Sequence, residues 1–121
     1  MAKDDYDVLV LYLLKYLYRC VRKGEIVDPD KVYFCDYPAK IEESYIIFIL
    51  RQLYQKGFIS GIEIIYVSDK ISKDYIINDI ENVEITSDGI EYLLNDRGME
   101  AAWNKIVAAG GLIFSAIQAL N

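Results

Sequence analysis

The chain has 121 residues, of which 54% are hydrophobic and 26% charged, and this balance fits one globular domain with its own core. Its formal net charge of −6, from 19 acidic and 13 basic residues, opposes general attraction to nucleic acid but permits a local basic patch. There is no histidine, which excludes Ser-His and Cys-His catalytic pairs and His-containing metal sites. The 11 tyrosines exceed what a small core hides, which mildly favours a protein interface.

The first predicted element is a helix over about residues 4–23, with Gly24 as its stop signal. Every residue from 8 to 14 is apolar, so this half of the helix requires contacts on all sides. The second half carries a basic stripe at helical spacing, made of Lys15, Arg19, Arg22 and Lys23. Such a stripe is usually a solvated face, and a ligand site is the less common alternative.

Two cysteines, Cys20 and Cys35, are far apart in sequence, and the opening M-A-K-D-D has no apolar secretory segment. We therefore expect reduced thiols in a cytoplasmic protein, with Cys20 as a small buried residue. No cofactor and no metal are expected, because the sequence has no phosphate-cradling glycine loop and no cluster of metal ligands. The pair Asp28 and Asp30 is explained by helix capping rather than by metal binding.

A short second helix is predicted to begin at Pro29 with Asp28 as its N-cap, and Pro38 separates it from a third helix. The third helix lies within residues 41–57, and its apolar stripe should face the core: Ile46, Ile49, Leu50 and Leu53. Its N-cap position holds Glu42, which caps poorly. Its exposed line is expected to comprise Ser44, Ile47, Arg51, Tyr54 and Gln55.

A β-wing is predicted after the third helix, from strands at residues 62–67, 75–77 and 83–85. The polar turn at residues 68–73 places Lys70 and Lys73 at or near the tip of this wing. Lysines there can contact a DNA backbone, although in turns they more often serve only solubility.

The C-terminal part is predicted to be helical, with a helix from the cap Thr86 to about residue 96 and a break at Gly98. Another apolar helical stripe follows from 99 to 107. We divide the chain into a domain at 1–105 and an apolar tail at 106–121, which is too short for a span of about 20 apolar residues. The tail should cover the first helix, in its own chain or across a homodimer interface formed by Val8, Leu11, Ile113, Ile117 and Leu120.

Three segments resemble the YjcQ-like family of small bacterial and prophage proteins. They are K-D-D-Y with its helix to Cys20 and Gly24, Y-I-I-F-I-L-R-Q-L-Y-Q-K-G-F-I-S-G at 45–61, and I-T-S-D-G-I-E-Y-L at 85–93. The resemblance implies a winged-helix-type domain and a cytoplasmic location. It brings no established activity and no catalytic residues.

These observations predict an α+β fold, a winged helix-turn-helix with three N-terminal helices, a small antiparallel wing and C-terminal helices. The first functional hypothesis is a DNA-binding regulator, with double-stranded DNA contacted by Ser44, Arg51, Tyr54, Gln55, Lys70 and Lys73. The second is a protein-interaction module without a nucleic-acid surface, favoured by the tyrosines and the acidic charge. An enzyme is not expected.

Overall fold

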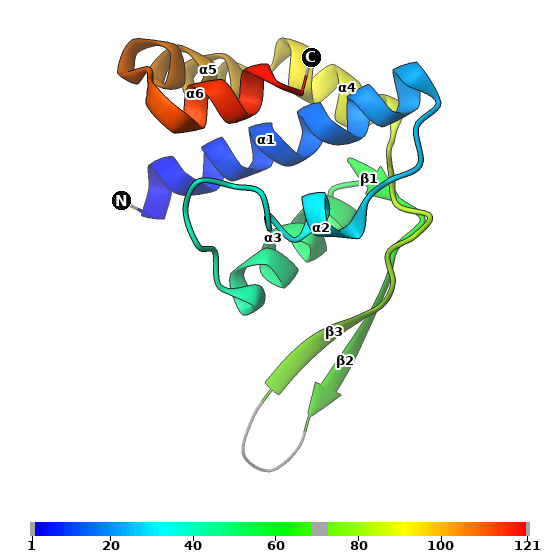
Figure 1. Cartoon of the computed structure of the whole chain (residues 1–121). Helices are drawn as coiled ribbons and strands as arrows, with labels where there is room; N and C mark the ends of the chain where they lie inside the picture. Colours follow the sequence, from blue (N-terminus) through cyan, green and yellow to red (C-terminus); the bar gives the residue numbers. More distant parts are fainter. Residues whose placement is uncertain (1, 69–72, 121) are drawn as a thin grey trace.

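The computed structural model describes residues 2–68 and 73–120, with side chains at 6–67 and 75–120. Within these ranges the chain is a mixed α+β protein of six helices and four short strands (Figure 1). The helices are α1 (Ala2–Lys23), α2 (Pro29–Val32), α3 (Glu43–Gln55), α4 (Ser87–Asn95), α5 (Arg97–Ala109) and α6 (Gly111–Gln118). The strands are β1 (Ile59–Ser60), β2 (Glu63–Ser68), β3 (Lys73–Asp79) and β4 (Glu84–Ile85).

Helix α1 runs through the middle of the molecule, with α4, α5 and α6 on one side and α2 and α3 on the other (Figure 1). Residues 9–14 are all buried, and Leu13 and Leu14 are fully inaccessible to solvent. The uninterrupted apolar run therefore finds partners on all sides within its own chain, which confirms that this half of the helix needs a second contact surface.

Helices α2 and α3 form largely as their local sequence predicts. The Asp28 carboxylate accepts a hydrogen bond from the Asp30 backbone N–H (3.0 Å), and Pro29 occupies the first turn of α2. The predicted apolar stripe of α3 is buried throughout: Ile46, Ile49, Leu50 and Leu53. Glu42 occupies the N-cap position of α3 and makes no side-chain capping bond, as expected.

The three predicted strands do not form one wing, which corrects the sequence interpretation. Strands β2 and β3 pair as an antiparallel hairpin, with Ile65 opposite Ile76 and Tyr66 opposite Tyr75, and this hairpin extends away from the helices (Figure 1). The third predicted strand, β4, pairs instead with β1, which the sequence pattern did not reveal. Strand β1 has only two residues, which are too few to show the alternation of a strand.

Helix α4 lies directly over the β1–β4 pair. At Gly89 a Cβ atom would collide with the Phe58 carbonyl oxygen and lie 2.7 Å from Cγ1 of Ile85. The Thr86 hydroxyl accepts a hydrogen bond from the Gly89 N–H (3.0 Å) and donates one to the Gly57 carbonyl (2.6 Å). Thr86 therefore caps α4, as predicted, and also joins it to the end of α3.

Replacing Thr86 with alanine should lower the free energy of unfolding by about 1–2 kcal/mol, because the first turn of α4 loses its cap. The matched control is Thr86→Ser, which keeps the hydroxyl and should retain most of that stability. Urea unfolding followed by circular dichroism measures both. Equal losses in the two variants would show that the hydroxyl does not supply the effect.

The break between α4 and α5 lies at Asp96 rather than at Gly98. The Asp96 carboxylate accepts hydrogen bonds from the backbone N–H groups of Gly98 (2.7 Å) and Met99 (3.2 Å) and so caps α5. Gly98 belongs to the first turn of α5 and does not end a helix. Helix α5 continues to Ala109, so the predicted domain boundary after residue 105 falls inside it.

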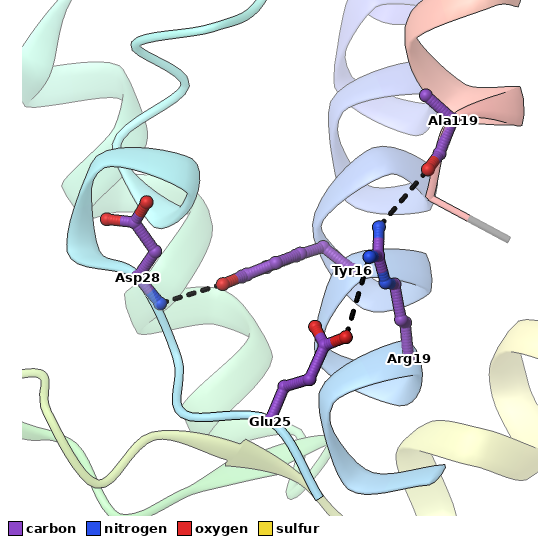
Figure 2. A network of polar contacts seen from close by, with 5 residues as sticks. All are labelled: Tyr16, Arg19, Glu25, Asp28 and Ala119. Carbon is purple, nitrogen blue, oxygen red and sulfur yellow. Dashed lines mark hydrogen bonds and ion pairs between the residues drawn. The ribbon is translucent and has the colours of Figure 1, made fainter. Parts of the chain in front are cut away.

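The C-terminal segment packs on α1 of its own chain. Ile117 and Leu120 are buried, and the Arg19 guanidinium donates a hydrogen bond to the Ala119 carbonyl at the end of α6 (3.2 Å; Figure 2). Arg19 also reaches the Glu25 carboxylate after α1 (3.5 Å). One side chain of α1 thus connects the tail to the loop that follows α1.

A second bond in Figure 2 fixes the entry to α2. The Asp28 N–H donates to the Tyr16 hydroxyl oxygen (2.7 Å), and Tyr16 itself is buried. Burial raises the pKa of Tyr16 to about 12, since a phenolate there would lose its hydration. The neutral phenol is therefore the form that accepts this bond at physiological pH.

Several of the predicted dimer residues are used inside the chain. Leu11, Ile117 and Leu120 are buried in the core, whereas Val8 and Ile113 are partly buried. The homodimer therefore stays a prediction, and only Val8 and Ile113 have surface left for it. Among the described residues, no helix has the length and apolar character to cross a membrane.

Candidate functional site: the groove between α3 and the hairpin

Helix α3 and the β2–β3 hairpin enclose a groove of about 570 Å³, which we call the α3–hairpin groove. Its lining combines aromatic, aliphatic and charged side chains: Glu43, Ser44, Ile47, Phe48, Arg51, Tyr75 and Ile76. Helix α3 is held in place by its buried stripe, while the hairpin projects beyond the core (Figure 1). The groove therefore has one firmly anchored wall and one wall that protrudes into solvent.

Arg51 joins the two walls of the groove. The centre of its guanidinium lies 4.0 Å from the ring centroid of Tyr75 on β3 and 5.4 Å from that of Phe48 on α3. Such stacking is worth about 0.5–2 kcal/mol, depending on how far the cation is desolvated. The Nε atom of Arg51 is buried and has no hydrogen-bond partner among the described residues. In this structure, the side chain predicted to read DNA bases lies against two aromatic rings.

The other residues predicted to contact DNA are distributed unevenly. Ser44 lines the groove beside Arg51, whereas Tyr54 and Gln55 are exposed on α3 outside its lining. Lys70 lies outside the described residues, and of Lys73 only the backbone, in β3, is described. The structure thus brings together Ser44 and Arg51 of the predicted set.

The hairpin carries exposed apolar side chains that the sequence analysis did not single out. Ile65, Tyr66, Val67 and Ile76 are 36–49% exposed, and Phe48 and Tyr54 on α3 are 39% and 47% exposed. The signal was present in the sequence, since I-I-Y-V at 64–67 is apolar at every position where a half-buried strand would alternate. This apolar α3–hairpin surface comprises Phe48, Tyr54, Ile65, Tyr66, Val67 and Ile76.

The two faces of the hairpin differ in their contacts, because the face of Tyr75 meets Arg51 of α3. Side chains alternate along a strand, so the Tyr66–Tyr75 pair and the Ile65–Ile76 pair lie on opposite faces. The tyrosine pair, with ring centroids 5.0 Å apart, lies on the face of Tyr75 that meets Arg51. Within the described residues, neither outer edge of the hairpin pairs with another strand. Unpaired apolar edges are typical places where another polypeptide adds a strand.

The charges near the groove disfavour phosphate. Glu43 lines it and Glu42 precedes α3, and both carboxylates are exposed. Arg51, the cation in the groove lining, is stacked on the two aromatic rings. Among the described residues, the lining of the groove therefore holds one carboxylate, that of Glu43, and one cation that is stacked on aromatic rings.

The described lining of the groove contains no cysteine and one carboxylate, that of Glu43. No group of three or more Cys, Asp or Glu side chains within residues 2–68 and 73–120 is placed to hold a metal ion. Cys20 is buried, as expected, and burial raises the pKa of its thiol. Cys35 is exposed, and neither cysteine forms a disulfide with the other.

A family model described as YjcQ protein matches residues 11–110 of the chain. The chain belongs to the YjcQ family. The matched range confirms the resemblance and contains α3, the hairpin and therefore the whole α3–hairpin groove. Helix α6 begins at Gly111, just beyond the YjcQ match. No curated protein and no solved structure was found to match the chain.

Proposed function

We propose that the chain is a non-enzymatic winged-helix protein of the cytoplasm that binds a protein partner through its α3–hairpin surface. In this architecture α1, α2 and α3 form the helical part, and the β2–β3 hairpin is the wing. The order of helices followed by a hairpin, with α3 and β3 in contact, supports the assignment.

The observation that carries the proposal is the apolar α3–hairpin surface. Burial of exposed side chains such as Ile65, Val67 and Ile76 against a partner would stabilise the complex. The gain is about 25 cal/mol for each Å² of apolar area buried. The partner we propose is an extended polypeptide segment with apolar side chains, which pairs with one of the two free hairpin edges and places its side chains beside the apolar side chains of both faces. A second copy of the chain fits the same chemistry and would form a homodimer through the hairpin, at an interface other than the predicted one.

DNA binding is the second candidate, favoured by the exposed polar side chains of Ser44 and Gln55 together with Tyr54 on α3. In a DNA-binding regulator these residues would face the major groove of double-stranded DNA. The carboxylates of Glu42 and Glu43 at the start of α3 oppose this placement. The stacking of Arg51 on Tyr75 also opposes its use as the base reader of the helix.

The two candidates are separated by the fluorescence anisotropy of a labelled random-sequence duplex titrated with the protein at low salt, and again as salt rises. Phosphate contacts supply nearly all of the affinity for non-specific DNA. The logarithm of that binding constant therefore falls linearly with the logarithm of the salt concentration. The protein-binding proposal expects no anisotropy change even at low salt. A salt-dependent rise would favour the DNA-binding regulator.

The protein-binding proposal is tested by two apolar residues of equal exposure. Ile76 on β3 and Val107 on α5 are each 47% exposed. In cross-linked capture from a lysate of the source cells, Ile76→Glu should lose the partner that the original chain retains, because a carboxylate would be buried unpaired in the interface. Val107→Glu should retain it.

Sedimentation velocity of the same proteins shows whether the partner is a second copy of this chain. In that case Ile76→Glu should be monomeric and Val107→Glu dimeric. A monodisperse monomer that captures nothing, or equal capture by both variants, would contradict the proposal.

A further inference from the structure

A separate cleft of about 410 Å³ lies on the other side of α1, between α1 and helices α4 and α5. We call it the α1–α5 cleft; its lining includes Lys15, Tyr18, Arg22, Leu93, Met99 and Trp103. Its volume lies within the range of about 300–1,000 Å³ that is usual for small-molecule sites. None of its residues belongs to the α3–hairpin groove.

Two cations of the basic stripe of α1 line this cleft. Lys15 and Arg22 are seven residues apart, which places them on the same face of the helix two turns apart. The Lys15 ammonium lies 4.6 Å from the ring centroid of Trp103, and the Arg22 guanidinium lies 4.7 Å from that of Tyr18. Both cations therefore border aromatic surface inside the cleft.

Among the described residues, neither cation forms an ion pair within 4.0 Å. The ion pairs Arg19–Glu25 and Lys31–Asp36 involve neither Lys15 nor Arg22. Burial, together with the nearby positive charge of Arg22, lowers the pKa of Lys15. An anion placed between the two would relieve both the repulsion and the loss of hydration.

The rest of the cleft is suited to an apolar body. Met99 and Leu93 are buried core residues that form part of its lining, and Trp103 packs against Phe114 with ring centroids 5.8 Å apart. Glu100, also in the lining, is exposed and leaves the three charges with a net of +1. A singly charged anion therefore matches the cleft better than a dianion.

We propose that the α1–α5 cleft binds a small amphipathic carboxylate, with its head group between Lys15 and Arg22 and its apolar body over Trp103, Leu93 and Met99. Charge-assisted hydrogen bonds from the two cations hold the carboxylate, and the apolar lining selects an aliphatic or aromatic acid over a polar one. This site is independent of the proposed protein-binding function.

The chain contains one tryptophan, Trp103, so its fluorescence reports directly on the cleft. We expect octanoate to change the Trp103 emission saturably at concentrations below micelle formation. Octanol has the same chain length without the charge and should bind at least about tenfold more weakly, since hydrogen bonds to charged groups contribute about 1.5–3 kcal/mol. No saturable change, or equal binding of the acid and the alcohol, would overturn the proposal.

Three neutralising variants complete the test. Lys15→Gln and Arg22→Gln should each weaken octanoate binding about tenfold and leave octanol binding unchanged. Lys23→Gln removes the same charge from the last turn of α1, outside the cleft lining, and should bind octanoate like the original chain. If Lys23→Gln weakens octanoate binding as much as the other two variants do, the effect is general charge attraction. That result would overturn the proposed site. Arg22 is exposed, so Arg22→Gln should remain folded even if Lys15→Gln does not.

Discussion

Replacement of Gly61 by alanine should lower the free energy of unfolding by more than about 3 kcal/mol, because two penalties coincide at this residue. Its φ is +74°, a conformation that costs an L-residue about 1–2 kcal/mol. A Cβ atom would also collide with the Asn82 carbonyl oxygen and lie 2.8 Å from the Asn82 carbonyl carbon. The chain between β1 and β2 would have to move away from the backbone that leads into β4.

The matched control is Gly57→Ala, because Gly57 has nearly the same φ (+77°) but no atom within 4 Å of the position that a Cβ would take. In this variant the free energy of unfolding should fall by only about 1–2 kcal/mol. Urea unfolding monitored by circular dichroism gives both values. If the two substitutions lower the free energy of unfolding by the same amount, residue 61 does not lie close to Asn82 in solution.

The second large effect is expected at Leu14, in the fully buried apolar half of α1. Leu14→Ala should lower the free energy of unfolding by about 2–5 kcal/mol, through lost burial and the cavity left behind. Leu94→Ala is the control, because Leu94 is 61% exposed on α4, and it should cost less than about 0.5 kcal/mol.

Thermal and urea unfolding of both leucine variants give these differences. A small cost at residue 14 would mean that α1 is not enclosed on both sides. A cost at residue 94 comparable to that at residue 14 would mean that α4 is buried more deeply than the structure indicates.

The longer helices of this chain were predictable because they carry several turns of apolar periodicity, and the short α2 was predictable from its cap and proline. The buried stripe of α3 and the caps Asp28 and Thr86 lie where the sequence analysis placed them. The break before α5 was misplaced because glycine alone was taken as the stop, whereas the Asp96 carboxylate caps the next helix.

Pairing between distant segments was not predictable in the same way. Strand β1 is too short for a periodic signal, and it is defined by its partner β4, which lies more than twenty residues later. The candidate site depends on the same kind of information. The helical period gave Arg51 an exposed position, but the ring that covers it belongs to Tyr75 on β3, and only the folded hairpin brings them together.

The central position of α1 has a consequence for the order of folding. A ribosome releases α1 first, yet one side of this helix is covered by α4, α5 and α6, which are synthesised last (Figure 1). Its apolar half therefore has no complete set of neighbours until the C-terminal helices have emerged. Domains dominated by such long-range contacts fold more slowly than those built from local ones. During synthesis, the apolar half of α1 thus stays exposed for longer than an element whose neighbours follow it directly in the sequence.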